Sequence, residues 1–199
     1  MHLQRSFVAT VLLFIPASLA LSDYANQVLG DISATSKLIQ KHEDTLNLYK
    51  GGITAAVPLA QEAYDIWRSL RIANVHLDDT TFTTDESDAI VADLTSANEV
   101  AIRLFGAYQE KEPLLNQAGV GFVAPILMQA IYREVDDYAV PLKQHMPQQY
   151  AARMERLKVT HTAAWDAAFS VYDPASNPIP SHPYMKFVPA LLPALGLLI

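Results

Sequence analysis

Apolar and polar residues alternate along most of the chain with the three-to-four-residue period of amphipathic α-helices. In the first such segment, residues 24–50, apolar side chains recur from Val28 to Leu46 with charged residues between them. Gly51 and Gly52 follow, and glycine enters left-handed backbone conformations at little cost. The pattern therefore predicts one long helix that ends at the double glycine.

Two further helical segments follow, separated by a polar stretch. The first covers residues 53–72 and contains Pro58, either in its first turn or as a kink. A loop is expected over residues 73–84. Thr83 with Glu86 three positions later has the signature of a capping box, so the next helix is expected to begin there.

The second half of the chain is less regular. The helix after the capping box is expected to end near Gln109, with a Lys-Glu-Pro turn that places Pro113 at the start of the next segment, residues 113–144. The apolar run 120–123 is interpreted as buried helix, because its flanks continue the helical period. A last helix is expected to open at Pro147.

The sequence contains no alternating apolar–polar run of a length that would indicate a β-strand. Residues 23–172 are therefore predicted to form an all-α domain, a bundle of about five antiparallel amphipathic helices with short connections. A domain of this length can bury roughly two thirds of its unfolded surface, which is enough for a core without disulfides.

Residues 1–20 have the pattern of a secretory signal peptide. One cation, Arg5, precedes an apolar run that is too short for a spanning helix, and Ser18 and Ala20 provide the small residues that signal peptidase needs. Cleavage is expected near Ala20 or Ser22. The mature protein is then expected to be secreted, either extracellular or in a cell wall.

The last segment, residues 173–199, combines several prolines with an apolar end. Small residues at 175–177, a short spacer and the apolar tail 187–199 follow the pattern of a GPI-attachment signal, in which a lipid replaces the tail. The proline after Asn177 and the prolines within the tail depart from that pattern. The alternative is a weakly surface-active tail.

Charge and composition exclude several classes of function. A formal net charge of -7 disfavours nucleic-acid binding, and the absence of cysteine excludes disulfides, thiolate metal sites and cysteine nucleophiles. The histidines after His2 never lie within four residues of one another, so no helix face offers a paired metal site. Since no nucleophile–base or cofactor-binding motif is present either, the sequence predicts a protein that is not an enzyme and that has no metal or cofactor.

The predicted apolar helix faces contain two unusual features: histidines, and segments with glycine or proline. His42 and His161 fall on apolar stripes, and each is expected to be a core or boundary histidine with its hydrogen bonds satisfied. Residues 119–125 contain two glycines and a proline, and Pro58 lies in a segment expected to face them. Such small and kinked segments can leave a slot between helices, although glycine also allows tight helix approach in a filled core.

Four stretches carry a resemblance to a known family. They are YKGGITAAVPLAQEAYDIW, TTDESDAIVADLTSANEV, KEPLLNQAGVGFVAPILMQ and MPQQYAARMERLKVTHTAAWDAAFSVY. In this order and spacing the chain resembles the hydrophobic-surface-binding protein A family of fungi, which includes the antigenic cell-wall galactomannoproteins. The resemblance implies a secreted helical domain that binds long-chain fatty acids or other lipids, or that adsorbs to hydrophobic surfaces, with a GPI anchor in some relatives.

The leading hypothesis is a secreted, non-catalytic protein that holds a fatty acid or another apolar ligand between its helices. Each buried methylene contributes about 0.8 kcal/mol before ordering costs. The head group is expected near the mouth, against Gln, Ser or Tyr side chains. Helical phase assigns the ligand wall to Val57, Tyr64, Trp67, Leu94, Ala101, Leu104, Phe122, Leu127, Ile131 and Phe169.

The main alternative is a cell-surface protein with a solid bundle, whose amphipathic helices spread on hydrophobic surfaces without an internal ligand. A hydrolase whose site the sequence does not reveal is a third hypothesis, which a screen of ester substrates would test.

Overall fold

A computed structural model describes residues 21–172, so the predicted signal peptide and the predicted C-terminal tail lie outside the described residues. Within 21–172 the chain is all-α and contains no strand, which confirms the predicted fold class. The helices are α1 Asp23–Leu48, α2 Ile53–His76, α3 Thr84–Gln117, α4 Val123–Gln144, the short 3-10 helix η1 Gln148–Tyr150 and α5 Ala151–Tyr172.

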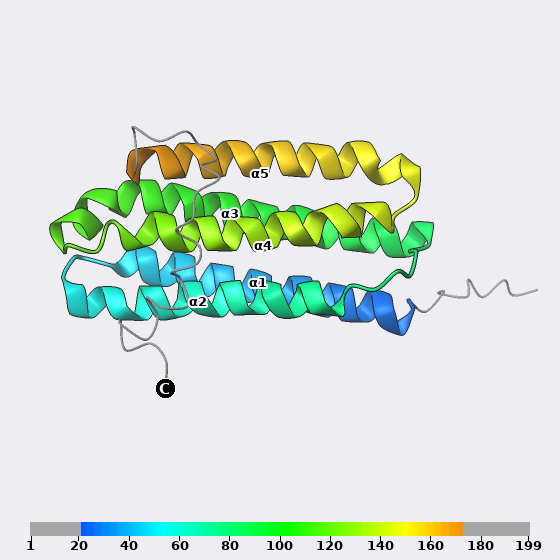
Figure 1. Ribbon diagram of the computed structural model, residues 1–199, viewed down its shortest axis with the longest axis horizontal. Helices are drawn as coiled ribbons and strands as arrows, with labels where there is room; N and C mark the ends of the chain where they lie inside the picture. The colour runs from blue at the N-terminus through cyan, green and yellow to red at the C-terminus, as the bar shows by residue number, and fades with distance from the viewer. Residues whose placement is uncertain (1–20, 173–199) are drawn as a thin grey trace, which may run out of the picture.

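Successive α-helices run antiparallel, and all five long helices lie along the long axis of the molecule (Figure 1). The main contacts join α1 to α2, α2 to α4, α4 to α5, α5 to α3, and α3 back to α1. The five long helices of the described chain therefore form a closed ring around one interior, and each helix contributes one face to it.

The start of α3 has the predicted capping box. The Thr83 hydroxyl accepts a hydrogen bond from the Glu86 backbone N–H, and the Glu86 carboxylate accepts one from the Thr83 backbone N–H. The other Glu86 oxygen accepts from the backbone N–H of Ser22, which caps α1. Hydrogen bonds from Ser22 and from the Thr83 backbone lower the pKa of Glu86 to about 2. One carboxylate thus ties the first turns of two helices together.

The predicted double-glycine end of α1 is also present. Gly51 and Gly52 have φ values of 105° and 92°, which non-glycine residues rarely adopt. The Lys111 ammonium donates to the carbonyls of Asn47 and Tyr49, so a charge from α3 caps the C-terminus of α1.

The second helix is longer than predicted. It continues to His76, and the loop covers 77–83 instead of beginning at residue 73. Ala73 is only 2% exposed, and the Asn74 amide donates to the Glu134 carbonyl in α4. The predicted boundary was wrong because this last turn is held by burial and by a contact with a distant helix, neither of which local residue types reveal.

The third helix passes through the Lys-Glu-Pro sequence that was predicted to end it. Pro113 lies inside α3, on its exposed side, where the missing backbone N–H costs one intrahelical hydrogen bond. Leu115 is 5% exposed and belongs to the core, so burial of the following turn offsets that cost. The prediction of a helix end near Gln109 and a restart at Pro113 was therefore wrong.

Residues 120–122 are a turn, not the buried helix that was predicted. The Gly119 N–H donates to the Asn116 carbonyl, and the Val120 N–H donates to the Leu115 carbonyl. With Gly119 at φ 75°, these two bonds form a Schellman motif that ends α3. At Gly121 a Cβ would collide with the Asn116 side chain, so the second glycine permits a close return of the chain.

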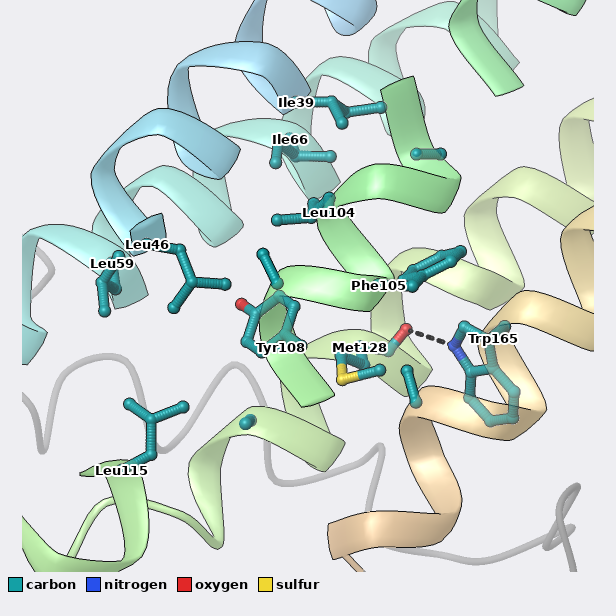
Figure 2. Close-up of a cluster of buried hydrophobic side chains, with 14 of the residues drawn as sticks. Ile39, Leu46, Leu59, Ile66, Leu104, Phe105, Tyr108, Leu115, Met128 and Trp165 are labelled. Atoms are coloured by element: carbon teal, nitrogen blue, oxygen red, sulfur yellow. Dashed lines mark hydrogen bonds between the residues drawn. The ribbon is translucent and has the colours of Figure 1, made fainter. Parts of the chain in front are cut away.

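The interior is packed in two main apolar clusters. The larger is centred on α3 and includes Tyr108, Met128 and Trp165 (Figure 2). The Trp165 indole N–H donates to the Met128 carbonyl at 3.4 Å, so the largest buried side chain has a partner for its polar atom. The second cluster lies toward the start of α1 and includes Ile90 and Leu142, both fully buried.

Candidate functional site

A cavity of about 140 Å³, here called cavity 1, lies inside the helix ring. All five long helices contribute to its walls, which are mostly apolar. Ile32 and Ile39 come from α1, Leu70 from α2, Leu94 from α3 and Leu142 from α4. The cavity is partly open to solvent, and its mostly apolar walls suit an apolar guest.

The charged residues around cavity 1 are paired with one another or with a neighbour. Asp136 of α4 forms an ion pair with Lys158 of α5, with Oδ1 and Nζ 2.6 Å apart. This hydrogen bond raises the pKa of Lys158, which therefore stays charged and engaged. Asp31 of α1 lies 2.8 Å from Nδ1 of His76. The walls consequently offer no cation without a partner to an incoming carboxylate.

Two polar atoms of residues lining cavity 1 have no hydrogen-bond partner among residues 21–172. They are Nε2 of His161 in α5 and the hydroxyl of Tyr138 in α4, and both atoms are buried. Burial lowers the pKa of His161 to about 4, so the imidazole is neutral at pH 7. Burial raises the pKa of Tyr138, so its hydroxyl keeps its proton.

The other nitrogen of His161 is held in place. Nδ1 lies 2.9 Å from Oδ1 of Asn98, whose amide nitrogen donates to the Thr160 hydroxyl. Because Oδ1 can only accept, Nδ1 carries the proton and Nε2 is left with a free lone pair. The rings of Phe105 and Tyr132 pack against the imidazole and fix its plane.

His42 is the buried histidine that fits the sequence prediction. Its Nε2 lies 2.7 Å from the Tyr108 hydroxyl and its Nδ1 lies 3.4 Å from the Glu62 carboxylate. Burial alone would raise the pKa of Glu62, but hydrogen bonds from His42, Thr45 and Lys41 lower it below its ordinary value. Both histidines are core or boundary residues with at least one hydrogen bond, as predicted, but only His42 has a partner at each ring nitrogen.

A second void, cavity 2, measures about 90 Å³ and lies between the start of α2 and the turn that leads into α4. Val57 and Ala60 line one side, and Val120 and Ala124 line the other. This is where the sequence suggested a slot between the Pro58 segment and residues 119–125. It is smaller than cavity 1. No glycine or proline in the sequence indicated the position of cavity 1.

The ten residues assigned to the ligand wall do not form one surface. Leu94 and Ala101 line cavity 1, and Val57 and Leu127 line cavity 2. The remaining six line neither cavity. Leu104 and Phe169 are buried in the larger core cluster, Ile131 packs against that cluster, Tyr64 and Trp67 form a small group with Ala130, and Phe122 is 60% exposed.

Sequence reasoning missed His161 and Tyr138 as site residues. The sequence analysis placed His161 on an apolar helix face, which is the available signal: a side chain with a polar tip on a buried face needs a partner. The sequence could not say whether that partner comes from the protein, and only the tertiary contacts distinguish His161 from His42.

Residues 21–172 contain neither a metal-binding cluster nor a helix able to span a membrane. No group of three or more histidine and acidic side chains is placed to hold a metal ion. No helix in this part of the chain combines the length and apolarity needed to cross a membrane.

Solved structures share this fold. Afmp4p in complex with palmitic acid superimposes with a TM-score of 0.71 at 17% identity, over 75% of this chain and 99% of that one. Ligand binding domain 1 of the Penicillium marneffei MP1 protein, complexed with arachidonic acids, has a TM-score of 0.69 at 16% identity, over 76% and 97% of the two chains. Ligand binding domain 2 of the same protein, complexed with multiple arachidonic acids, also gives 0.69 at 16% identity, over 78% and 98%.

No family model matches the chain, and no curated protein matches it in sequence. At these identities the structural likeness establishes a common all-helical fold. The resemblance to the hydrophobic-surface-binding family therefore stays a prediction from the sequence.

Proposed function

We propose that this protein is a non-catalytic lipid carrier that holds one aliphatic chain, such as that of a fatty acid, in cavity 1. The observation that carries the proposal is a mostly apolar cavity lined by all five helices of the ring. The fold supports it as well, because the similar structures contain palmitic or arachidonic acid.

The size of the void indicates how a chain enters. A cavity of about 150 Å³ with aliphatic walls is large enough for benzene, and cavity 1 is of that size, at about 140 Å³. A long chain therefore requires neighbouring helices to move apart. Each methylene that leaves water contributes about 0.8 kcal/mol, so sixteen carbons exceed association costs of several kcal/mol and leave enough for micromolar affinity.

Titration with a fluorescent long-chain fatty acid tests the carrier function directly. Ala97 lines cavity 1 on α3, whereas Ala92 lies on the exposed face of the same helix. Filling the cavity with Ala97→Phe is expected to weaken binding at least about tenfold, which corresponds to about 1.4 kcal/mol. Ala92→Phe adds the same side chain outside the cavity and is expected to leave binding unchanged.

Native mass spectrometry of the same samples gives the stoichiometry. One lipid per protein is expected in the native chain. Absence of saturable binding in the native protein, or equal binding by both variants, would reject the carrier function in cavity 1.

Secretion and attachment belong to the same proposal and rest on the sequence alone. Residues 1–20 direct export, and the tail 173–199 is either exchanged for a GPI lipid in the cell wall or retained. Release of the protein from cells by a phospholipase would support the anchor, and recovery of the intact C-terminus from culture medium would reject it.

Adsorption to hydrophobic surfaces is a second candidate, and one observation favours it. Leu48, Ile53 and Phe122 are 76%, 64% and 60% exposed, and all three lie at the end of the bundle that carries the α1–α2 and α3–α4 turns (Figure 1). Exposed apolar groups at one end favour contact with an oily surface. A rise in surface pressure that Ala97→Phe leaves unchanged would separate this function from ligand binding.

A further inference from the structure

Half of the unpartnered buried polar atoms among residues 21–172 belong to residues that border cavity 1. Four buried side-chain atoms lack a partner, and two of them, Nε2 of His161 and the hydroxyl of Tyr138, belong to residues that line this void. A buried polar atom without a hydrogen bond costs about 1–3 kcal/mol. Both residues border the same cavity, and both atoms are covered by protein, so a ligand in the cavity can supply the missing partners only after the helices move apart.

The chemistry of Nε2 restricts what that ligand is. Since Nδ1 of His161 donates to Asn98, Nε2 can only accept, and it requires a donor. An ionised carboxylate has no proton to donate. An alcohol hydroxyl has one, and the protein already uses this pairing elsewhere: the Tyr108 hydroxyl lies 2.7 Å from Nε2 of His42.

The surrounding charges favour the same class of ligand. Asp31 and Asp136 both line the cavity, and the ammonium of Lys158 is engaged by Asp136. A carboxylate inserted between these groups would meet two acids and no free cation, which opposes burial of a second negative charge. A neutral hydroxyl carries no such penalty.

We propose that cavity 1 selects a long-chain lipid that bears a hydroxyl group, and that this hydroxyl donates a hydrogen bond to Nε2 of His161. The same movement of helices that admits the chain uncovers this atom, because α4 and α5 carry both polar groups and much of the cavity wall. This inference rests on the proposed lipid-carrier function.

Tyr138 provides a donor for a second oxygen of the ligand. The Tyr132 hydroxyl lies 3.0 Å from the Thr162 hydroxyl, so His161 is at the level of residue 132 on the antiparallel α4. Tyr138 is six residues further along that helix, or about 9 Å at 1.5 Å per residue. A second oxygen group further along the ligand chain could accept a hydrogen bond from the Tyr138 hydroxyl.

Competition against a fluorescent acyl probe at pH 7.5 tests the selection. The competitors are 1-hexadecanol, palmitate and hexadecane, which have the same chain length. Hexadecanol is expected to bind at least about tenfold more tightly than palmitate. In His161→Phe this preference is expected to fall about fivefold or more, with hexadecane binding unchanged, because an aromatic ring remains while the acceptor Nε2 is lost together with the Nδ1 hydrogen bond to Asn98.

His145→Phe is the matched control, since His145 lines neither cavity. It is expected to retain the preference for hexadecanol. Equal or tighter binding of palmitate in the native protein, or an unchanged preference in His161→Phe, would overturn the inference and leave the carrier function standing. Failure of all three competitors to displace the probe, or failure of the probe to bind, would instead count against the carrier function, and with it the inference.

Discussion

The two buried histidines mark two regions of the same bundle that differ in how their interior is completed. Around His42, helices α1, α2 and α3 provide a partner for each ring nitrogen, from Glu62 and from Tyr108. Around His161, helices α3, α4 and α5 provide a partner for one nitrogen only and leave a void beside it. In the first region the protein supplies every partner itself, and in the second a cavity borders a histidine with one unpartnered nitrogen.

This difference separates stability from binding. A polar network with every member satisfied stabilises one arrangement, whereas an unsatisfied atom beside a void is a cost that a ligand can remove. Substitutions in the two regions should therefore affect different properties of the protein. In the first region they should destabilise the free protein, and in the second they should change ligand preference.

The largest expected difference comes from replacing each histidine by phenylalanine. His42→Phe leaves the Glu62 carboxylate and the Tyr108 hydroxyl without their buried partner, and is expected to lower the free energy of unfolding by about 3 kcal/mol. His161→Phe loses only the contact with Asn98 and removes an unsatisfied atom, so a change within about 1 kcal/mol is expected. Urea denaturation at pH 7 measures both, and similar losses in the two variants would erase the distinction.

The pH dependence of stability sharpens the comparison. The pKa of His161 is about 4 in the folded protein, below its ordinary value of 6.5, so between these values the unfolded chain binds the proton first. The contribution of neutral His161 to the free energy of unfolding is therefore fully present above pH 6.5 and is lost as the pH falls toward 4. At pH 4.5 we expect His161→Phe to gain about 2–3 kcal/mol relative to the native protein, compared with the difference at pH 7.

Denaturation curves of the native protein and of His161→Phe at pH 7 and pH 4.5 give the stability difference between the two proteins at each pH. The predicted value of about 2–3 kcal/mol is the change in that difference between the two pH values. The subtraction removes other groups that titrate in both proteins, including Glu86, whose pKa of about 2 places its own loss below pH 4.5. Parallel pH profiles for the two proteins would mean that His161 titrates normally in the fold.

The smallest expected effects come from the two tyrosines. Tyr108→Phe removes the hydroxyl beside Nε2 of His42 and is expected to cost about 1–2 kcal/mol. Tyr138→Phe removes a hydroxyl without a partner and is expected to leave the stability of the free protein unchanged or slightly higher. Thermal unfolding of both variants provides the measurement. A loss in Tyr138→Phe as large as that in Tyr108→Phe would show that the Tyr138 hydroxyl is already satisfied.

Local signals in the sequence predicted the helical class, the capping box at the start of α3 and the glycine end of α1. The Thr83–Glu86 box and the glycine pair at 51–52 act within a few residues, so residue types alone locate them. The end of α2 and the continuation of α3 past Pro113 depend on the burial of Ala73 and Leu115. Their packing partners lie far away in the sequence. Local rules predict a helix boundary where the helix propensity of the residues falls. In both cases the helix continues further because the next turn is buried.

The ligand wall could be predicted only in part, for a related reason. Helical phase identifies which residues face inward, such as Leu94 and Leu104, but both a filled core and a cavity are lined by inward-facing residues. Leu94 borders cavity 1, while Leu104, almost three turns further along the same helix, is packed into the core. Whether an inward residue meets a neighbour or a void depends on the sizes of side chains on the other four helices.

The cap at Ser22 has a consequence for maturation. Its hydroxyl accepts from the Ala25 N–H, and its own N–H donates to Glu86, so this single residue closes α1 and joins it to α3. Proteolytic trimming after Ala20 would leave both contacts in the finished polypeptide, whereas trimming after Ser22 would delete them and begin the chain inside the first helical turn. If residues 1–20 are a signal peptide as predicted, only cleavage after Ala20 would keep both Ser22 contacts, and sequencing the N-terminus of the secreted protein would show which position is used.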